Sequence, residues 1–507
     1  MKKYISHVLM ALLYTMGSYA QSMDDAIRYV RPELKGTARY MAMGGAFTAL
    51  GGDFSAIKDN PASAAVFLNS EVGVSINSIN NEINANYFGN NNTVDSRAFD
   101  IEQFGIVLVL NDTDDGDFTK IGLAYNYQIE QHFNEKFNAI GVNNNSGLDD
   151  YFLFHAFGID TENLRIRDDE IDRYGEDGAY RYVYDYLGGQ YGFSGQQAFL
   201  GFQGYMIDEN GFDVNGNAIH RSFSNPENNP VTHDFFVTHT GKNSKHSFTL
   251  SSQYQDKLYI GVNLNSHRSE FTRIDDLLEN NYGSGANIND SNFINELYTI
   301  GNGFSFQLGT IYKPTKNIRL GLSYQSPTWY EMTDEFKQYM DSSSRNGVNL
   351  DPIYFDYNLS TPSQLSGGLA YIFGTKGLIS VQYDHVNIQN TSFDIGNGDD
   401  NFINQNEKIE STLQAAGTLK VGGEYRMNQL SLRGGYFKQN SFNKLSHDLS
   451  NGYSLGLGYD FGGSTLSMAL VQQERQRSES LYQEGLTDQF SLKNEQLQFV
   501  VSYLLKL

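Results

Sequence analysis

The chain has 507 residues, 14% of them aromatic, and a formal net charge of −23. That charge excludes a nucleic-acid-binding protein of the usual basic kind, because phosphates attract basic surfaces. There is no cysteine, so disulfides are excluded as the means of holding so long a chain together. A closed ring of strands is a fold that needs no such crosslinks.

Residues 1–20 have the three parts of a secretory signal peptide. Lys2 and Lys3 form the basic start, residues 4–17 are mostly apolar, and Ser18-Tyr19-Ala20 supplies small residues for cleavage before Gln21. The apolar run is too short to span a membrane as a helix. No cysteine follows the cleavage position, so a lipoprotein anchor is excluded.

Residues 36–62 form a small, apolar, glycine-punctuated stretch that ends in Asn60-Pro61-Ala62. No Gly-Lys-Ser/Thr follows its glycines and no strand precedes them, so it is not a phosphate-binding loop. Taken alone, the stretch also fits two helical pieces of a soluble domain, with Gly51-Gly52 as an ordinary helix end.

From residue 70 onward the chain repeats one theme, a two-residue alternation of apolar with small or polar residues. In a membrane barrel one face of each strand meets lipid and the other faces the lumen, which imposes this period. Tyrosine often ends the apolar face, as expected of an interfacial aromatic girdle. The clearest segments are residues 121–127, 318–324, 419–425, 453–461 and 497–507.

The connections between these segments alternate in length. Short turns are expected near residues 111–117, 255–257, 314–317, 374–377, 427–429 and 462–463. Long polar loops are expected at about 89–99, 135–244, 272–302, 332–352, 393–407, 442–451 and 476–492. The total is fourteen antiparallel strands, if residues 354–373 are one strand interrupted at Thr361-Pro362, where proline cannot donate to the ladder.

Met43-Gly44-Gly45-Ala46-Phe47 followed by Asn60-Pro61-Ala62 resembles the N-terminal motif of the FadL-like channels, outer-membrane barrels that pass long-chain fatty acids and other hydrophobic compounds. The resemblance implies an all-β, 14-stranded transmembrane barrel at residues 70–507, with an N-terminal hatch, residues 21–69, inside its lumen. It places the chain in the outer membrane of a Gram-negative cell and implies passive uptake through a lateral opening near a kinked strand. The hatch and ligand residues that it implies are Gly44, Gly45, Phe47, Phe54, Asn60, Pro61 and Ala62.

The family also binds solutes at an apolar surface groove. Apolar residues recur at near-helical spacing within two polar segments that are expected to be loops, and these are the groove candidates: Leu277, Leu278, Phe293, Trp329, Tyr330 and Phe336. The alternative is that these side chains only pack the loops together.

Neither catalysis, a metal nor a cofactor is expected. Most histidines fall in expected loops (His155, His220, His233 and His447), and His385 stands alone on a strand, so no triad or haem-ligand spacing is recognisable. The acidic stretches 208–216 and 398–407 have oxygen donors but not the full calcium-loop spacing.

Two functions remain open. The first is a passive channel whose partners are outer-membrane lipid and hydrophobic small molecules. The second is a non-transporting barrel within a larger outer-membrane assembly, with protein partners bound through residues 135–244, which are longer than a small solute requires. An apolar tunnel behind the hatch favours the first function, and a lumen filled with side chains favours the second.

Overall fold

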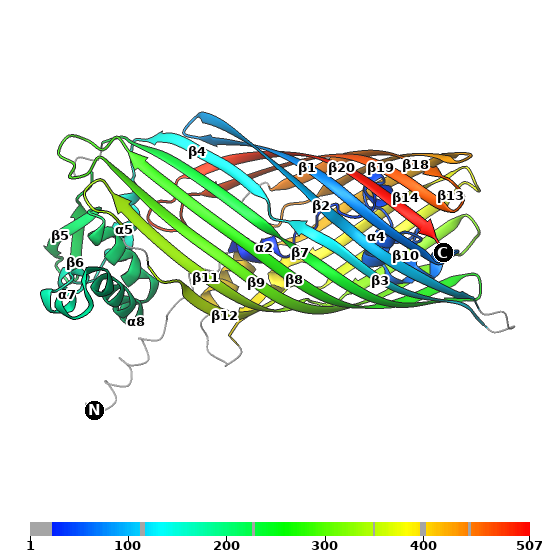
Figure 1. Ribbon diagram of the computed structural model, residues 1–507, viewed down its shortest axis with the longest axis horizontal. Coiled ribbons are helices and arrows are strands. Elements are labelled where there is room, and N and C mark those ends of the chain that lie inside the picture. The colour runs from blue at the N-terminus through cyan, green and yellow to red at the C-terminus, as the bar shows by residue number, and fades with distance from the viewer. Residues whose placement is uncertain (1–22, 112–116, 226–228, 348–349, 396–401, 445–447) are drawn as a thin grey trace, which may run out of the picture.

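In the computed structural model, residues 23–111, 117–225, 229–347, 350–395, 402–444 and 448–507 are described. The expected signal peptide lies outside these residues. Most of the chain forms a single antiparallel sheet that closes where the first strand pairs with the last, from Glu71 opposite Lys506 to Asn86 opposite Ser491 (Figure 1). The result is a long barrel.

Fourteen strands make the wall, as the sequence predicts, and four of them are interrupted, so that eighteen segments share the sheet. The uninterrupted strands are β1 (Glu71–Tyr87), β2 (Asn90–Asn111), β7 (Val231–Tyr254), β8 (Leu258–Asn280), β9 (Asp290–Tyr312), β16 (Ala415–Met427), β17 (Leu430–Gln439), β18 (Leu449–Asp460), β19 (Ser464–Ser480) and β20 (Gln489–Lys506). The interrupted strands are β3 (Phe118–His132) with β4 (Glu135–Asn143), β10 (Ile318–Gln325) with β11 (Trp329–Ser342), β12 (Ile353–Ser360) with β13 (Gln364–Ile372), and β14 (Gly377–Asn387) with β15 (Ser392–Asp394). The predicted interruption at Thr361-Pro362 lies between β12 and β13.

The outer surface of the barrel carries an apolar band. On β18 the Leu455 side chain is 70% exposed, whereas Ser454 faces the lumen and is 2% exposed. Exposed aromatic side chains such as Tyr312 and Phe461 edge the band next to the short connections, which define the turn end of the barrel. An outward apolar band edged by aromatic residues is the surface of a barrel that sits in a bilayer.

Several strands are much longer than expected. β7, β8 and β9 have 24, 23 and 23 residues, whereas a tilted strand needs about 9–11 to cross a bilayer. The predicted loops at 89–99, 272–302, 332–352 and 476–492 are therefore wrong in large part, because strand pairing continues through most of them. Beyond the apolar band both faces of a strand meet polar surroundings, so the two-residue alternation is lost from the sequence.

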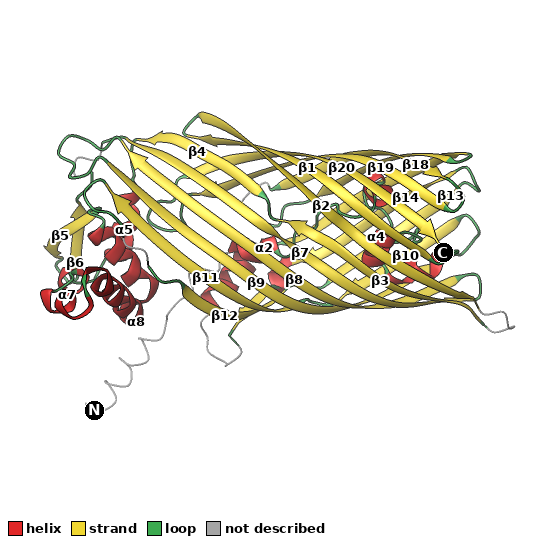
Figure 2. Cartoon of the chain, viewed as in Figure 1, coloured by secondary structure: helices red, strands yellow, loops and turns green. Residues whose placement is uncertain are grey.

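At the loop end, opposite the turn end, residues 144–225 and 229–230 form a separate layer called the cap here (Figure 2). Strands β4 and β7 take up both ends of the predicted loop 135–244, so the cap is shorter than predicted. Aromatic side chains of the cap, Phe152 and Phe199 among them, are buried together with Phe235, Leu277 and Phe293 of the wall. The elements of the cap are α5 (Leu148–Ala156), α6 (Thr161–Leu164), α7 (Asp168–Tyr174), α8 (Glu176–Gln203) and the hairpin β5 (Ile207–Phe212) and β6 (Ala218–Ser222).

The remaining helices are short. Four belong to the N-terminal segment before β1, and Figure 1 shows this segment inside the barrel: α2 (Met23–Arg28), α3 (Ala38–Ala42), α4 (Phe54–Asp59) and the 3-10 helix η1 (Pro61–Val66). Two interrupt or follow wall strands: η2 (Ile388–Asn390) and α9 (Ile403–Thr412). None of the helices in the described part of the chain has both the length and the apolar character to cross a membrane.

Candidate functional site

The hatch folds around its glycines. Gly44 and Gly45 have φ angles of 60° and 74°, which L side chains rarely adopt, and they turn the chain after α3. The helices α3 and α4 are capped by Thr37 and Asp53, which accept hydrogen bonds from the backbone amides of Tyr40 and Ser55. The Thr37 hydroxyl also donates to the Asp53 carboxylate at 2.8 Å, which joins the two caps. The motif thus specifies a compact fold rather than a ligand loop.

The hatch docks on inward-facing glycines of the wall. A methyl group added at Gly321 of β10 would collide with the Thr48 carbonyl, and one at Gly309 of β9 would collide with the Asn60 side chain. The same holds for Gly261, Gly422 and Gly435, which face Pro61, Met43 and Gly44. The backbone of the hatch therefore lies directly against the backbone of the wall, which only glycine permits.

Asn60 ties the hatch to the wall. Its side-chain amide donates to the Thr48 carbonyl at 2.8 Å and to the Thr310 carbonyl of β9 at 2.9 Å. Its Oδ1 accepts from the Ala62 amide at 3.1 Å, which caps η1. One buried side chain thus joins two parts of the hatch and one wall strand.

A buried charge cluster adds a second tie. The carboxylate of Glu424 on β16 lies 3.0 Å from Arg39 of the hatch and 2.8 Å from Arg433 of β17. Within the hatch, the Tyr40 hydroxyl donates to Asp59 at 2.8 Å. Moving Arg39 away from Glu424 would leave a buried charge without its partner, which is costly. The cluster therefore holds the hatch in position.

All seven hatch residues singled out from the sequence lie in this docked layer. Phe47 packs against Tyr40 with ring centroids 5.3 Å apart, and Phe54 packs against Phe67 at 5.4 Å. Pro61 and Ala62 lie against Gly261 of β8. Gly44, Gly45 and Asn60 make the turns and ties described above. None of the seven lines a cavity described below, so their place in the structure is in docking the hatch.

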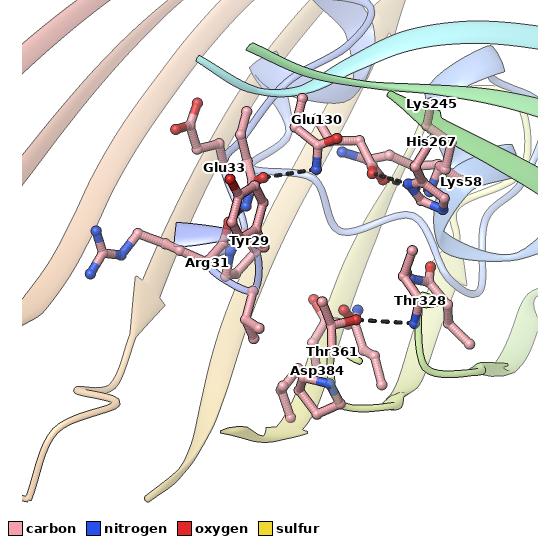
Figure 3. Close-up of a pocket in the computed structure, with 18 of the residues that line it drawn as sticks. Tyr29, Arg31, Glu33, Lys58, Glu130, Lys245, His267, Thr328, Thr361 and Asp384 are labelled. Carbon is pink, nitrogen blue, oxygen red and sulfur yellow. Dashed lines mark hydrogen bonds and ion pairs between the residues drawn. The ribbon is translucent and has the colours of Figure 1, made fainter. Parts of the chain in front are cut away.

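Two cavities lie in the lumen beside the first part of the hatch, each of about 110 Å³. Figure 3 shows the first, where Lys58, Glu130, Lys245 and His267 lie on one side and Thr328, Thr361 and Asp384 on the other. Its wall charges are paired, with Lys245 2.6 Å from Glu130 and Lys420 2.8 Å from Asp384. The cavity is therefore polar but locally neutral.

The second cavity is lined by five arginines: Arg28, Arg31, Arg273, Arg475 and Arg477. Glu135 is 2.8 Å from Arg477, and Asp448 is 2.6 Å from Arg31 and 2.9 Å from Arg475. Sequence reasoning missed both cavities, because their linings come from the hatch and many separate strands and leave no local pattern.

The strand ladder is interrupted beside the arginine-lined cavity. β2 pairs with β3 only from Asn111 back to Gln103, while β4 pairs only with β7. Across the gap, the Asn92 side chain reaches the Asn138 carbonyl at 3.3 Å. On the lumen side of the kink, the Gln131 side chain donates to the carbonyls of Arg28 and Arg31. A kinked strand thus lies next to both a wall gap and the hatch.

The six predicted groove residues do not form one groove, although two of them, Trp329 and Tyr330, line a groove on the outer surface of the wall. They lie on strands β8, β9 and β11, so the helical spacing inferred for them is wrong. Leu277 and Phe293 are directly paired and fully buried under the cap, and Tyr330 is buried in the lumen. Phe336 is partly buried in a lumen cluster, whereas Leu278 and Trp329 are exposed on the surface.

An apolar groove that sequence reasoning did not locate lies on the cap. It has a volume of about 770 Å³ and lies between α5, α8 and the loop at Gly485. His155 lies in it, and burial lowers the pKa of its imidazole to about 4, so the ring is uncharged at neutral pH. The apolar lining is Leu153, Phe154, Phe157, Ile159 and Tyr191.

Among the described residues, the histidines lie at separate places in the fold. His233 bonds to Glu279 at 2.7 Å beneath the cap, and His385 lies exposed on the outer face. Over the described ranges, no group of three or more His, Asp or Glu is placed to hold a metal. In the acidic stretch 208–216, Asp213 accepts from Asn215 and Asn217 as in a tight turn. His447 and residues 398–401 lie outside the described residues.

Comparison with known proteins agrees with this architecture. The family model described as outer membrane protein transport protein (OMPP1/FadL/TodX) matches residues 243–468. A search of curated proteins gives no match to the chain.

Three solved structures share the fold. A Pseudomonas aeruginosa FadL homologue is 12% identical with a TM-score of 0.55, and the Pseudomonas putida toluene transporter TodX is 14% identical with a TM-score of 0.52. The CymD monoaromatic hydrocarbon channel is 12% identical with a TM-score of 0.51. Each comparison covers 94% of this chain and 99% of the other.

Proposed function

We propose that this chain is an outer-membrane channel of the FadL/TodX type, that it passes hydrophobic compounds by diffusion, and that it releases them sideways through its wall. The observation that carries the proposal is the combination of a hatch docked in the lumen with a break in the strand ladder of the wall. The hatch contacts the wall backbone to backbone at the turn end. The strand ladder is broken between β2 and β4, at the level of the arginine-lined cavity.

The path that fits this geometry begins at the cap. Its apolar groove of about 770 Å³ faces outward and is large enough for an acyl chain or a small aromatic molecule. From there the solute passes to the lumen side of the β3–β4 kink and leaves between β2 and β4. Sideways exit avoids the hatch, whose buried ties would otherwise have to break.

The names of the solved structures supply the candidate solutes. One is a FadL homologue, and two are named for toluene and for monoaromatic hydrocarbons. Long-chain fatty acids and monoaromatic compounds are therefore the first substrates to test.

The test uses intact Gram-negative cells that lack their own fatty-acid channel, with the chain supplied on a plasmid. We expect radiolabelled dodecanoic acid and toluene to enter at least about tenfold faster than without the chain. The chain lacks cysteine, so an Asn92→Cys/Asn138→Cys pair can be bridged selectively across the gap. Oxidation of this pair should slow entry and reduction should restore it. Entry no faster than in cells without the chain would refute a transport role.

One observation favours a second function, as a subunit of an outer-membrane assembly. The two lumen cavities described above are small and polar, and the rest of the upper lumen holds buried side chains, such as Phe271 and Tyr357. The cap is also large and bears an exposed apolar groove. Affinity purification from the native outer membrane under mild detergent tests this function. A stoichiometric protein partner, lost when residues 144–230 are deleted, would support it.

A further inference from the structure

Three neighbouring wall strands are interrupted at one level. Below the interruptions, Gln325 of β10, Gln364 of β13 and Val386 of β14 lie in register. Above them, Trp329 of β11, Ser360 of β12 and Ser392 of β15 lie in register. The residues between these rows, 326–328, 361–363 and 387–391, are called the seam. Because three adjacent strands are interrupted at the same level, the sheet has fewer ladder hydrogen bonds there than elsewhere.

The seam is held by few contacts. Thr361 donates its amide to the Thr328 carbonyl at 3.0 Å, and the Thr328 amide donates to the Thr361 hydroxyl at 3.0 Å, the bond drawn in Figure 3. Between 361–363 and 387–391 the described residues show no ladder pairing. The Oδ1 of Asn387 and the Oγ1 of Thr391 are buried there without a hydrogen-bond partner in the described part of the chain. Buried atoms without a hydrogen-bond partner cost stability, so this part of the wall is less well held than an intact ladder.

A hollow lies on each side of the seam. On the lumen side is the polar cavity of Figure 3, lined at the seam by Thr328, Thr361 and Pro362. On the outer side is a groove of about 500 Å³ lined by Phe304, Trp329 and Leu359. Tyr330 borders both, and its hydroxyl is hydrogen-bonded to Asn243 of β7. Only one side-chain layer therefore separates the lumen from the outer surface here.

The groove lies at the upper edge of the apolar band. Phe304, Trp329 and Ser360 are cross-strand neighbours, and the next outward-facing row is polar: Asn302, Glu331, Asn358 and Asp394. A Trp and a Phe just below a polar row are the pattern of the interface between acyl chains and headgroups. A molecule leaving the seam would enter the outer leaflet with its polar end at headgroup depth.

We infer that the seam is a second lateral passage, separate from the gap between β2 and β4, and that it serves amphiphiles with a short polar end and a single apolar chain. The polar end fits the cavity beside Lys58 and Lys420, whose 110 Å³ has room for a few heavy atoms. The apolar chain of the amphiphile lies along the outer groove past Trp329. Tyr330 is the gate between the lumen cavity and the outer groove. This inference rests on the proposed transport function.

The seam can be locked with a disulfide. A Thr328→Cys/Thr361→Cys pair bridges the seam, and Ser323→Cys/Ser366→Cys bridges the same strands where the ladder is intact. In the cell assay above, oxidation of the seam pair should lower dodecanoic acid entry at least about threefold, reversibly, and leave toluene entry unchanged. Oxidation of the control pair should change neither. If both oxidised pairs leave dodecanoic acid entry at the unmodified rate, the seam is not a passage, while transport itself stands.

A second measurement does not depend on transport. Purified protein in nanodiscs is irradiated with dodecanoic acid that carries a diazirine at its chain end, and the modified peptides are mapped. We expect adducts at Phe304 and Trp329, lost in Tyr330→Trp, which enlarges the gate side chain, and kept in the milder Tyr330→Phe. Adducts confined to the cap groove, or adducts at Trp329 that Tyr330→Trp does not reduce, would overturn the inference. Trp329 and Phe304 also contact lipid, so labelling from the lipid phase needs a control. Adducts that form at the seam should disappear when excess unlabelled dodecanoic acid is present.

Discussion

At the scale of single residues, Asn60 shows how one side chain positions the hatch. Its amide and carbonyl make three hydrogen bonds, to Thr48, Thr310 and Ala62, and its side chain is fully buried. Its site is preset by Pro61, which biases the preceding residue to extended backbone, where Asn60 is found at φ −151° and ψ 110°. A local sequence feature thus becomes a contact across the lumen.

Asn60→Ala should loosen the hatch without unfolding the wall. It leaves the Thr48 and Thr310 carbonyls without this donor, at a cost of about 1–3 kcal/mol. We expect faster leakage of small sugars into intact cells and unchanged heat-modifiability of the barrel. Asn84→Ala removes an exposed bond to Thr93 on the outer hairpin and serves as the control. Equal leakage in both variants would contradict the role of Asn60.

At the scale of elements, the hatch and the wall were predictable to different degrees. The glycine motif and the lipid-facing alternation predicted the hatch, the fourteen strands and the break at Thr361-Pro362. The polar upper halves of β8 and β9 were read as loops, since no lipid imposes a period there. Leu277 and Phe293 were misread for the same reason. The docking glycines of the wall were not recognised, because a glycine in a strand does not show in sequence what approaches it.

Glycines of β10 and β13 differ in whether they contact the hatch, so substituting them distinguishes an effect on docking from an effect on strand stability. On β13, Gly368 faces Ala49 of the hatch, while nothing lies near Gly367. On the neighbouring β10, Gly321 meets the Thr48 carbonyl. Gly321→Ala should displace the hatch and raise small-solute leakage, because its methyl group collides with backbone. Gly367→Ala should be near neutral. Proteolysis from the periplasmic side checks whether Gly321→Ala exposes the hatch. Identical cleavage patterns in this variant and the wild type would show that docking does not need Gly321.

The cap contains a buried acid, Asp149, that should make the stability of the cap depend on pH. Burial, with the nearby carboxylates of Glu279 and Asp150, raises the pKa of Asp149 to about 7. Asp149 also lies near Ser222, and Glu279 is itself bonded to His233 and to the Leu148 amide. A raised carboxyl pKa adds stability that is present at low pH and is lost as pH rises through about 7. His155 acts oppositely, since its pKa is lowered.

Asp149→Asn should therefore stabilise the cap more at pH 8 than at pH 5. The asparagine is uncharged at both values, so the gain at pH 8 should be at least about 1 kcal/mol. Hydrogen exchange of α5 measured at the two pH values checks this. Asp169→Asn, on the exposed helix α7, is the control. Equal protection of α5 in wild type and Asp149→Asn at pH 8 would argue against a charged Asp149 beneath the cap.

At the scale of the whole molecule, the apolar band fixes how the barrel sits in the membrane. The band reaches from the aromatic edge at Tyr312, Tyr459 and Phe461 to the level of Phe304 and Trp329. Trp329 is the single tryptophan of the chain, so its fluorescence reports on one defined height. The strands continue well beyond it and carry the cap away from the bilayer.

In nanodiscs, Trp329 emission should be quenched about twofold more by lipids brominated near the headgroup than by lipids brominated near the chain end. The physical reason is its place at the edge of the band, next to the polar row at Glu331. The variant Trp329→Phe/Phe461→Trp moves the reporter to the opposite edge and should give the same preference. Stronger quenching of Trp329 by deep bromines would place the bilayer higher on the barrel.

The docking of the hatch also constrains the order in which the barrel is built. The Ala38 amide donates to Ser502 of β20, and Phe54 fills the space left by Gly73 of β1 and Gly105 of β2. The hatch therefore touches both sides of the line where the first and last strands meet. We therefore expect the last pairing step, between β1 and β20, to take place with the hatch already in the lumen.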